Sequence, residues 1–147
     1  MLTNGFEQLA AILGDELGDL CCVELVRTKE SITARDLLSG EDLEALCLSF
    51  ENGLLTVRAV GEDDTVFVEV GYSEEFTLSS RRDLSEESLW NTIIGKRLWE
   101  VWALTNSRGY LDAIQFEFSK MGGIGRVRIQ LEVVASAFRP FVVHSDD

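Results

Sequence analysis

The chain has 147 residues, of which 46% are hydrophobic, and its 26 acidic side chains against 13 basic ones give a net charge of −13. This length fits a single domain spanning residues 1–147, and the charge disfavours nucleic acid and anionic membranes as partners, because both are bound through Lys and Arg. No apolar run approaches the ~20 residues of a membrane-spanning helix, and the N-terminus lacks the basic region of a secretory signal, so a soluble cytoplasmic protein is expected.

The first half of the chain predicts one short helix followed by four strands. Asn4 and Glu7 have the spacing of a helix capping box, and apolar residues then recur at helical spacing up to Gly14, which ends the helix. The dipeptide Asn52-Gly53 is a strong hairpin signal. The strands are expected at 20–27, 43–50, 54–60 and 65–71, with a polar loop at 29–42.

The second half predicts the same succession of elements. Residues 72–84 are expected to form a loop, and the polar residues from Asp83 to Glu86 then begin a second helix that ends before Gly95. Pro140, the only proline, indicates that the last strand lies at a sheet edge, because proline cannot donate a ladder hydrogen bond. Strands are expected at 96–105, 110–119, 126–134 and 138–144.

The two halves also resemble each other in sequence. Residues 43–50 (Leu-Glu-Ala-Leu-Cys-Leu-Ser-Phe) parallel residues 111–118 (Leu-Asp-Ala-Ile-Gln-Phe-Glu-Phe), and a Val-Arg pair follows each segment, at Val57-Arg58 and Val127-Arg128. Alternation alone makes amphipathic strands look alike, but the shared Ala and Val-Arg favour duplication. We predict an α+β fold of about eight mostly antiparallel strands in two similar halves, approximately 4–71 and 84–144, arranged as one curved sheet or as two packed layers.

The acidic excess lies in one half of the chain. Residues 1–75 hold 17 acidic and four basic residues, whereas residues 76–147 carry no net charge. Such a local field can steer a basic protein partner, although acidic loops also keep a protein soluble. Trp99 is expected to be an exposed anchor for the partner if its sheet face is wet, and core if that face is covered. The other expected contact residues are Glu62, Asp63, Asp64, Glu69, Glu74 and Glu75, with Glu41, Asp42 and Glu44 behind them.

A second candidate site is a pocket on the predicted sheet around Glu100. Strand alternation places Glu100 on one face with Leu98, Trp102 and Leu104, where a carboxylate needs a partner or a shifted pKa. Arg128 or Lys96 could supply that partner, and a structural ion pair is the simpler explanation. The pocket would be formed by Glu100, Trp102, Tyr110 and Arg128.

Signals for catalysis and for metal binding are weak. The only histidine, His144, lies three residues from the C-terminus, and the acidic turn at 62–64 lacks the ligand spacing of a calcium loop. The glycines within 122–125 lie between two strands, whereas phosphate-binding glycine loops precede a helix. Three cysteines, two of them adjacent, make a poor disulfide framework. We predict no enzymatic activity, no metal and no cofactor.

The most distinctive stretch runs from Trp99 to Ser136. It contains Asn106-Ser-Arg-Gly-Tyr-Leu-Asp-Ala-Ile-Gln-Phe-Glu-Phe-Ser119 and Gln130-Leu-Glu-Val-Val-Ala-Ser136. This stretch resembles a family of small uncharacterised bacterial proteins over about the last third of the chain. The resemblance implies a bacterial cytosolic protein and supplies no catalytic residues.

The expected function is that of a non-catalytic acidic module that binds a basic protein. Immunity proteins, which neutralise a basic toxin, are of this kind, and opposite charges would speed the encounter. The alternatives are a small-molecule-binding or enzymatic pocket around Glu100, a secretion chaperone, and a structural homo-oligomer that buries the Pro140 strand or an apolar sheet face.

Overall fold

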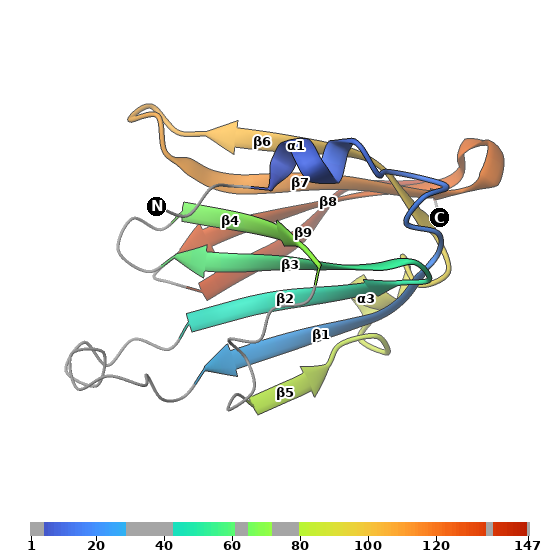
Figure 1. The fold of residues 1–147 in the computed structure, drawn as a ribbon, viewed down its shortest axis with the longest axis horizontal. Coiled ribbons are helices and arrows are strands. Elements are labelled where there is room, and N and C mark those ends of the chain that lie inside the picture. The colour runs from blue at the N-terminus through green and yellow to red at the C-terminus, as the bar shows by residue number, and fades with distance from the viewer. Residues whose placement is uncertain (1–4, 29–42, 61–64, 72–79, 135–136, 147) are drawn as a thin grey trace.

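Two antiparallel sheets pack face to face in the computed structural model (Figure 1). The described residues are 5–28, 43–60, 65–71, 80–134 and 137–146. The first sheet has the order β4-β3-β2-β1-β5, and its strands are β1 Leu20–Thr28, β2 Leu43–Phe50, β3 Gly53–Val60, β4 Thr65–Val70 and β5 Ser80–Asp83. The second has the order β6-β7-β8-β9, with β6 Arg97–Thr105, β7 Leu111–Lys120, β8 Ile124–Val134 and β9 Ala137–Ser145. The predicted antiparallel architecture is therefore confirmed, as two packed layers.

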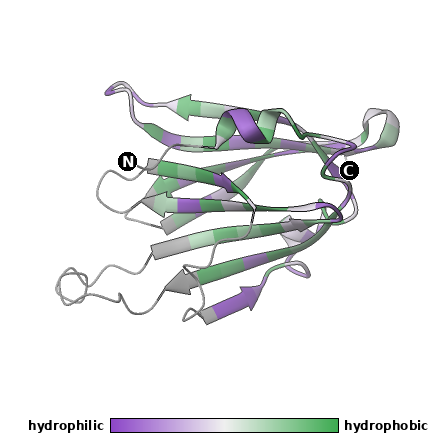
Figure 2. Cartoon of the chain, viewed as in Figure 1, coloured by the Kyte–Doolittle hydropathy of each residue, from purple (hydrophilic) through white to green (hydrophobic). Residues whose placement is uncertain are grey.

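The described residues contain nine strands, one more than the sequence predicts. The additional strand, β5, falls inside the region 72–84 that was expected to be a loop, and it pairs with β1 from Glu24↔Asp83 to Arg27↔Ser80. Its sequence is Ser-Arg-Arg-Asp, which has no apolar alternation, and Figure 2 shows it as hydrophilic. A short, charged strand of this kind protects a sheet edge from further pairing, so its residues carry no core pattern.

Both helices are shorter than predicted. Helix α1 spans Phe6–Ala10 and has Gly5 as its N-cap, so the Asn4–Glu7 capping box is not the start of the helix. Helix α3 spans only Ser88–Asn91. In the described part of the chain, no helix has both the length and the apolar character needed to cross a bilayer.

The residues expected to begin the second helix instead support a strand. The Ser85 amide donates to Asp83 Oδ1 at 2.8 Å, and the Ser85 hydroxyl accepts a hydrogen bond from the Val23 amide at 2.9 Å. Asp83 and Ser85 therefore form a local turn beside β1. The helix-start pattern was the wrong interpretation because these residue types cap turns as readily as helices.

The β2–β3 hairpin is confirmed, but its turn lies one residue earlier than the Asn-Gly pair. Phe50 pairs with Gly53, which leaves Glu51 and Asn52 as the two turn residues. A Cβ atom at Gly53 would lie 3.0 Å from Leu17 Cδ2, so close packing accounts for the glycine. The edge position of Pro140 is confirmed too, because β9 is the last strand of its sheet.

The N-terminal segment joins the two sheets. The Gly5 amide donates to the Val68 carbonyl of β4 at 2.7 Å, and the Gly14 amide donates to the Leu98 carbonyl of β6 at 2.8 Å. Further along, Arg97 Nε donates to Asp19 Oδ1 at 3.0 Å. We call residues 5–20 the strap. It includes α1 and runs from β4, an edge strand of the first sheet, to β6, an edge strand of the second (Figure 1).

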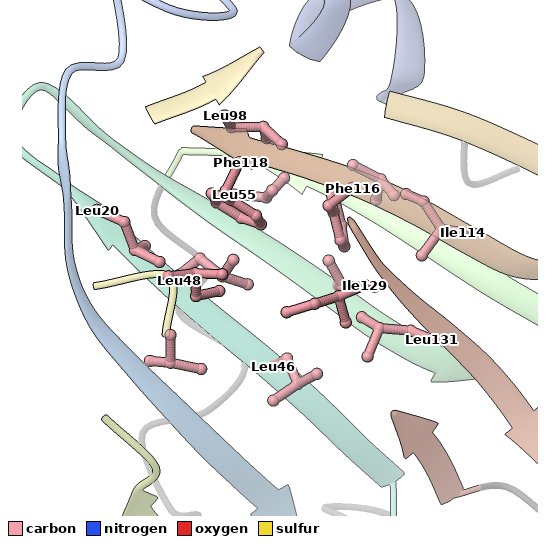
Figure 3. Packing of buried hydrophobic residues seen from close by; sticks show 14 of the residues in the cluster. Leu20, Leu46, Leu48, Leu55, Leu98, Ile114, Phe116, Phe118, Ile129 and Leu131 are labelled. Carbon is pink, nitrogen blue, oxygen red and sulfur yellow. The ribbon is translucent and has the colours of Figure 1, made fainter. Parts of the chain in front are cut away.

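The hydrophobic core lies between the sheets and draws on both of them (Figure 3). Phe116 and Phe118 of β7 are its largest fully buried side chains, and their ring centroids are 6.1 Å apart. The apolar residues that alternate along β2, β7 and β8 all belong to it: Leu46, Leu48, Phe50, Ile114, Phe116, Phe118, Val127, Ile129, Leu131 and Val133.

Part of the other face of the five-stranded sheet is buried as well. Val26, Ala45 and Cys47 form a second buried cluster, with Leu54 packed against it. The unbroken apolar run from Ala45 to Leu48 is the signal for this, because strands buried on both faces lose their polar positions. Burial raises the pKa of the Cys47 thiol above its ordinary value of 9.0.

Alkaline pH should consequently destabilise the fold through Cys47. The unfolded thiol ionises near 9.0 while the folded thiol keeps its proton, so stability falls as the pH rises from about 9 through the higher folded pKa. Urea unfolding under reducing conditions, compared between about pH 8 and pH 10.5, measures the effect. Cys47→Ala should lose that part of the pH dependence, and equal slopes in both proteins would contradict the assignment.

Candidate functional site

The four-stranded sheet turns a mostly polar face away from the core, and strand pairing arranges its side chains in three rows. We call this set the outer lattice. The rows across β6, β7, β8 and β9 are Glu100–Glu117–Arg128–His144, Trp102–Gln115–Gln130–Phe141 and Leu104–Ala113–Glu132–Arg139. The core residues Ile114, Phe116 and Phe118 alternate with the β7 members of the lattice, which fixes the direction of the whole set.

A β-bulge at Trp99 determines which way Glu100 points. Leu98 pairs with Phe118 and Glu100 pairs with Glu117, so two steps along β6 match one step along β7. The extra residue reverses the alternation, as bulges do. Leu98 is therefore fully buried, whereas Glu100 is exposed. The predicted sharing of one face by Glu100 and Leu98 is wrong, and Glu100 needs no buried partner.

Arg128 contacts two neighbouring members of the outer lattice, Glu117 and Trp102. Its Nη2 lies 3.0 Å from Glu117 Oε1, and its guanidinium carbon lies 4.3 Å from the centroid of the Trp102 ring. The predicted pairing with Glu100 is thus replaced by an ion pair with Glu117. Lys96, the other predicted partner, donates instead to the Gly125 carbonyl at 2.8 Å. Arg128 therefore contacts Trp102 and Glu117, whereas Glu100 lies in the same row on β6, with β7 between it and Arg128.

Tyr110 lies apart from this corner. It is 45% exposed in the β6–β7 connection, and its backbone is hydrogen-bonded to Asn106. Glu117 lies seven steps further along the chain, which at about 3.4 Å per step is roughly 24 Å. Tyr110 precedes β7 at the end opposite Glu117, so it lies away from the corner that contains Arg128.

Trp99 is held by contacts inside the molecule. Its indole Nε1 donates to the Ser119 carbonyl at 3.2 Å, and its ring covers Gly14 of the strap so closely that a Cβ there would lie 2.6 Å from Cζ3. Of the two predicted roles, an exposed anchor or a packed residue, this geometry supports packing.

Hydrogen bonds connect Gln115, Gln130 and Glu132 within the lattice, and His144 contacts Asp146 outside it. Gln115 Nε2 donates to Gln130 Oε1 at 2.5 Å, and Gln130 Nε2 donates to Glu132 Oε1 at 2.9 Å. His144 Nε2 lies 2.7 Å from Asp146 Oδ1, and this contact, with help from Arg126, lowers the pKa of the Asp146 carboxyl. Sequence reasoning missed Gln115, Gln130 and His144 as site residues, although the polar alternation along β7 and β8 pointed to the first two.

The predicted acidic contact residues are mostly in segments that the structure does not describe. Glu62, Asp63, Asp64, Glu74, Glu75, Glu41 and Asp42 all lie outside the described residues, as does the side chain of Glu44. Glu69 lies on β4, in the other sheet, where its Oε2 is 3.4 Å from Arg58 Nη2. The strand ends that border 29–42 and 61–64 meet at one end of the five-stranded sheet, because Thr28 pairs with Leu43 and Val60 pairs with Thr65.

The described side chains of this face thus offer charged, amide and aromatic groups. Within that described part, no three His, Cys, Asp or Glu side chains come together as metal ligands would.

Residues 23–146 match the model of a protein family described as a family of unknown function, DUF6334. The match therefore extends well beyond the last third of the chain, where the resemblance was first noted. No curated protein and no solved structure matches the chain.

Proposed function

The chain belongs to DUF6334, a family of unknown function, and from this premise we propose that it is a non-catalytic module that binds a basic protein. The observation that carries the proposal is the location of its charge. Segments 29–42, 61–64 and 72–79, all connections of the five-stranded sheet, hold nine acidic residues and two basic ones. Two of these segments join strands at the same end of that sheet. The acidic excess of the sequence thus falls in the connections between strands of one sheet.

Concentrated charge of this sign favours rapid capture of a positively charged protein. Steered association reaches about 10⁸–10⁹ M⁻¹s⁻¹ at low salt, and screening slows it steeply as salt is added. An immunity-type role, in which the chain neutralises a basic toxin, is the specific form that we propose. We place it in a bacterial cytoplasm, in keeping with the free thiols of Cys21, Cys22 and Cys47.

The proposed module has an internal duplication. Strands β1–β4 form one antiparallel meander and β6–β9 form another, each preceded by a short helix. The sequence parallel between 43–50 and 111–118 falls on β2 and β7, the second strand of each meander. A duplicated scaffold could keep one copy for stability while the other gained the acidic connections.

A structural homo-oligomer formed through the β9 edge has less support. Phe141, Val142 and Val143 are exposed on this strand, which would favour association. However, Pro140 lacks an amide hydrogen, and a register shift between Arg128 and Ile129 makes β9 bulge at Val143. Proline and bulges are the features by which natural sheets prevent edge pairing.

Affinity capture at two salt concentrations tests the proposed function. The immobilised chain should retain a basic protein from native lysate at about 50 mM salt and release it at about 500 mM, because the Debye length shrinks severalfold. The purified protein should then bind with an association rate at least tenfold lower at the higher salt, by the steering argument. The matched variant carries Glu62→Gln, Asp63→Asn and Asp64→Asn, and should bind more slowly at low salt only. Recovery of no basic protein, or equal recovery by the variant at both salts, would count against the proposal.

A further inference from the structure

We infer that one corner of the outer lattice receives a cationic side chain, arginine or lysine, from the protein partner. The corner consists of Glu100, Trp102, Glu117 and Arg128. The inference rests on the proposed function, because it names where a basic partner would be held, and it places that contact on the four-stranded sheet.

The first observation is an excess of negative charge in this corner. Glu100 and Glu117 are directly opposite each other on β6 and β7, where Cβ atoms lie about 4.5–5.5 Å apart and like charges are destabilising. Arg128 pairs with Glu117. Among the side chains that the structure describes, Glu100 has no hydrogen-bond or ion-pair partner, and it is exposed. One further cation would complete the pairing.

The second observation is that the corner already binds one guanidinium group. Arg128 is held between a carboxylate, 3.0 Å away, and the face of an indole, 4.3 Å from its centroid. These are the two interactions by which proteins recognise guanidinium and ammonium groups. Trp102 is only half-buried and lies two residues from Glu100 on the same strand and face. An incoming cation therefore finds the Glu100 carboxylate beside a half-exposed indole, one face of which is already covered by Arg128.

The third observation is the order of charges along the row that runs from Glu100 on β6 to His144 on β9. Its β6 and β7 positions are Glu100 and Glu117, whereas its β8 and β9 positions are Arg128 and His144. An anionic group would be repelled at the β6 side, so a cationic one fits there. Tryptophan and arginine are also the residue types that most often dominate binding energy at protein interfaces.

A competing explanation is that Glu100 serves only to prevent the edge strand β6 from pairing with a strand of another molecule. Charged residues on edge strands prevent intermolecular pairing, and β6 is an edge. The two explanations differ in their consequences, because a guard residue matters for self-association, whereas a binding residue matters for affinity toward cations.

Titration with a matched pair of short peptides tests the inference. Acetyl-Gly-Gly-Arg-Gly-Gly-amide and its citrulline counterpart differ in charge but hardly in shape. Their binding is followed through the indole N–H resonance of Trp102, assigned with Trp102→Phe. The arginine peptide should shift this resonance and the citrulline peptide should not. Glu100→Gln should weaken arginine-peptide binding by about three- to tenfold, as loss of one charge-assisted contact does. The matched control is Glu132→Gln, which lies on the same face in another row and should change it less than twofold.

Three results would overturn the inference. These are equal shifts with the two peptides, unchanged affinity in Glu100→Gln, or self-association of Glu100→Gln without loss of peptide binding. The fate of the proposed function is read separately. If a basic partner binds with the same affinity to Glu100→Gln, this corner is not its binding site, but the proposed function still holds. If the arginine peptide binds here but no basic protein is captured at low salt, the corner is a cation site and the proposed function is contradicted.

Discussion

Replacing Phe118 with alanine should lower the free energy of unfolding by about 3–5 kcal/mol, the usual cost of removing a buried phenylalanine. Phe118 is 0% exposed and lies in β7, between Leu98 of β6 and Val127 of β8. Its ring also packs against Phe116. The cavity would form at the centre of the sandwich, where neighbouring strands on both sides limit collapse. Urea unfolding followed by circular dichroism measures the loss.

Two further variants make this expectation specific. Phe118→Leu keeps most of the volume and should cost less than half as much, about 1–1.5 kcal/mol. Tyr110→Ala removes an aromatic ring that is exposed, and should change stability by no more than about 0.5 kcal/mol. If Phe118→Ala cost less than the leucine variant, the ring would not be the central packing element that the structure shows.

Gly14→Ala should cost about 2–4 kcal/mol, which combines a backbone term with overpacking. Gly14 has a φ of +75°, and its missing Cβ leaves the space that the Trp99 ring fills. Trp99 cannot swing away easily, because its indole nitrogen is hydrogen-bonded to the Ser119 carbonyl. The variant should therefore weaken the contact between the strap and β6. Chemical denaturation gives the change in free energy.

Gly95 provides a matched control for the steric part of that cost. Its φ is +84°, yet nothing lies within 4 Å of a Cβ built there. Gly95→Ala should therefore show only the backbone term, about 1–2 kcal/mol. In a Trp99→Leu background the cost of Gly14→Ala should fall toward the same value, a coupling of about 1–2 kcal/mol in a double-mutant cycle. Equal costs at Gly14 and Gly95 in the unmodified chain would show that Trp99 exerts no steric effect.

Most strands could be predicted because their pattern is local. β2 has the predicted bounds, and the other predicted strands differ from the structure by one or two residues at their ends. β5 could not be found this way, because an edge strand of Ser-Arg-Arg-Asp buries nothing and so leaves no apolar period. Burial of Val26 and Cys47 on the outer side of the first sheet also departs from simple alternation.

The candidate site depended on strand register, which sequence alternation does not contain. Alternation assumes one residue per step, so a single bulge at Trp99 was enough to move Glu100 from the core side to the outer lattice. The pairing of Arg128 with Glu117 likewise follows from register, since these residues are directly opposite on β7 and β8. Residue types indicated the chemistry of the corner, but its geometry came from tertiary pairing.

The strap has a consequence for how the chain assembles. Each sheet consists largely of neighbouring hairpins, which close short loops and can form early. The bond between the Gly14 amide and the Leu98 carbonyl instead joins positions 84 residues apart in the sequence (98 − 14). Closing so long a loop costs more entropy than closing a hairpin, so we expect this contact to form late in folding. The cooperative unit accordingly begins before residue 23, where the family match starts.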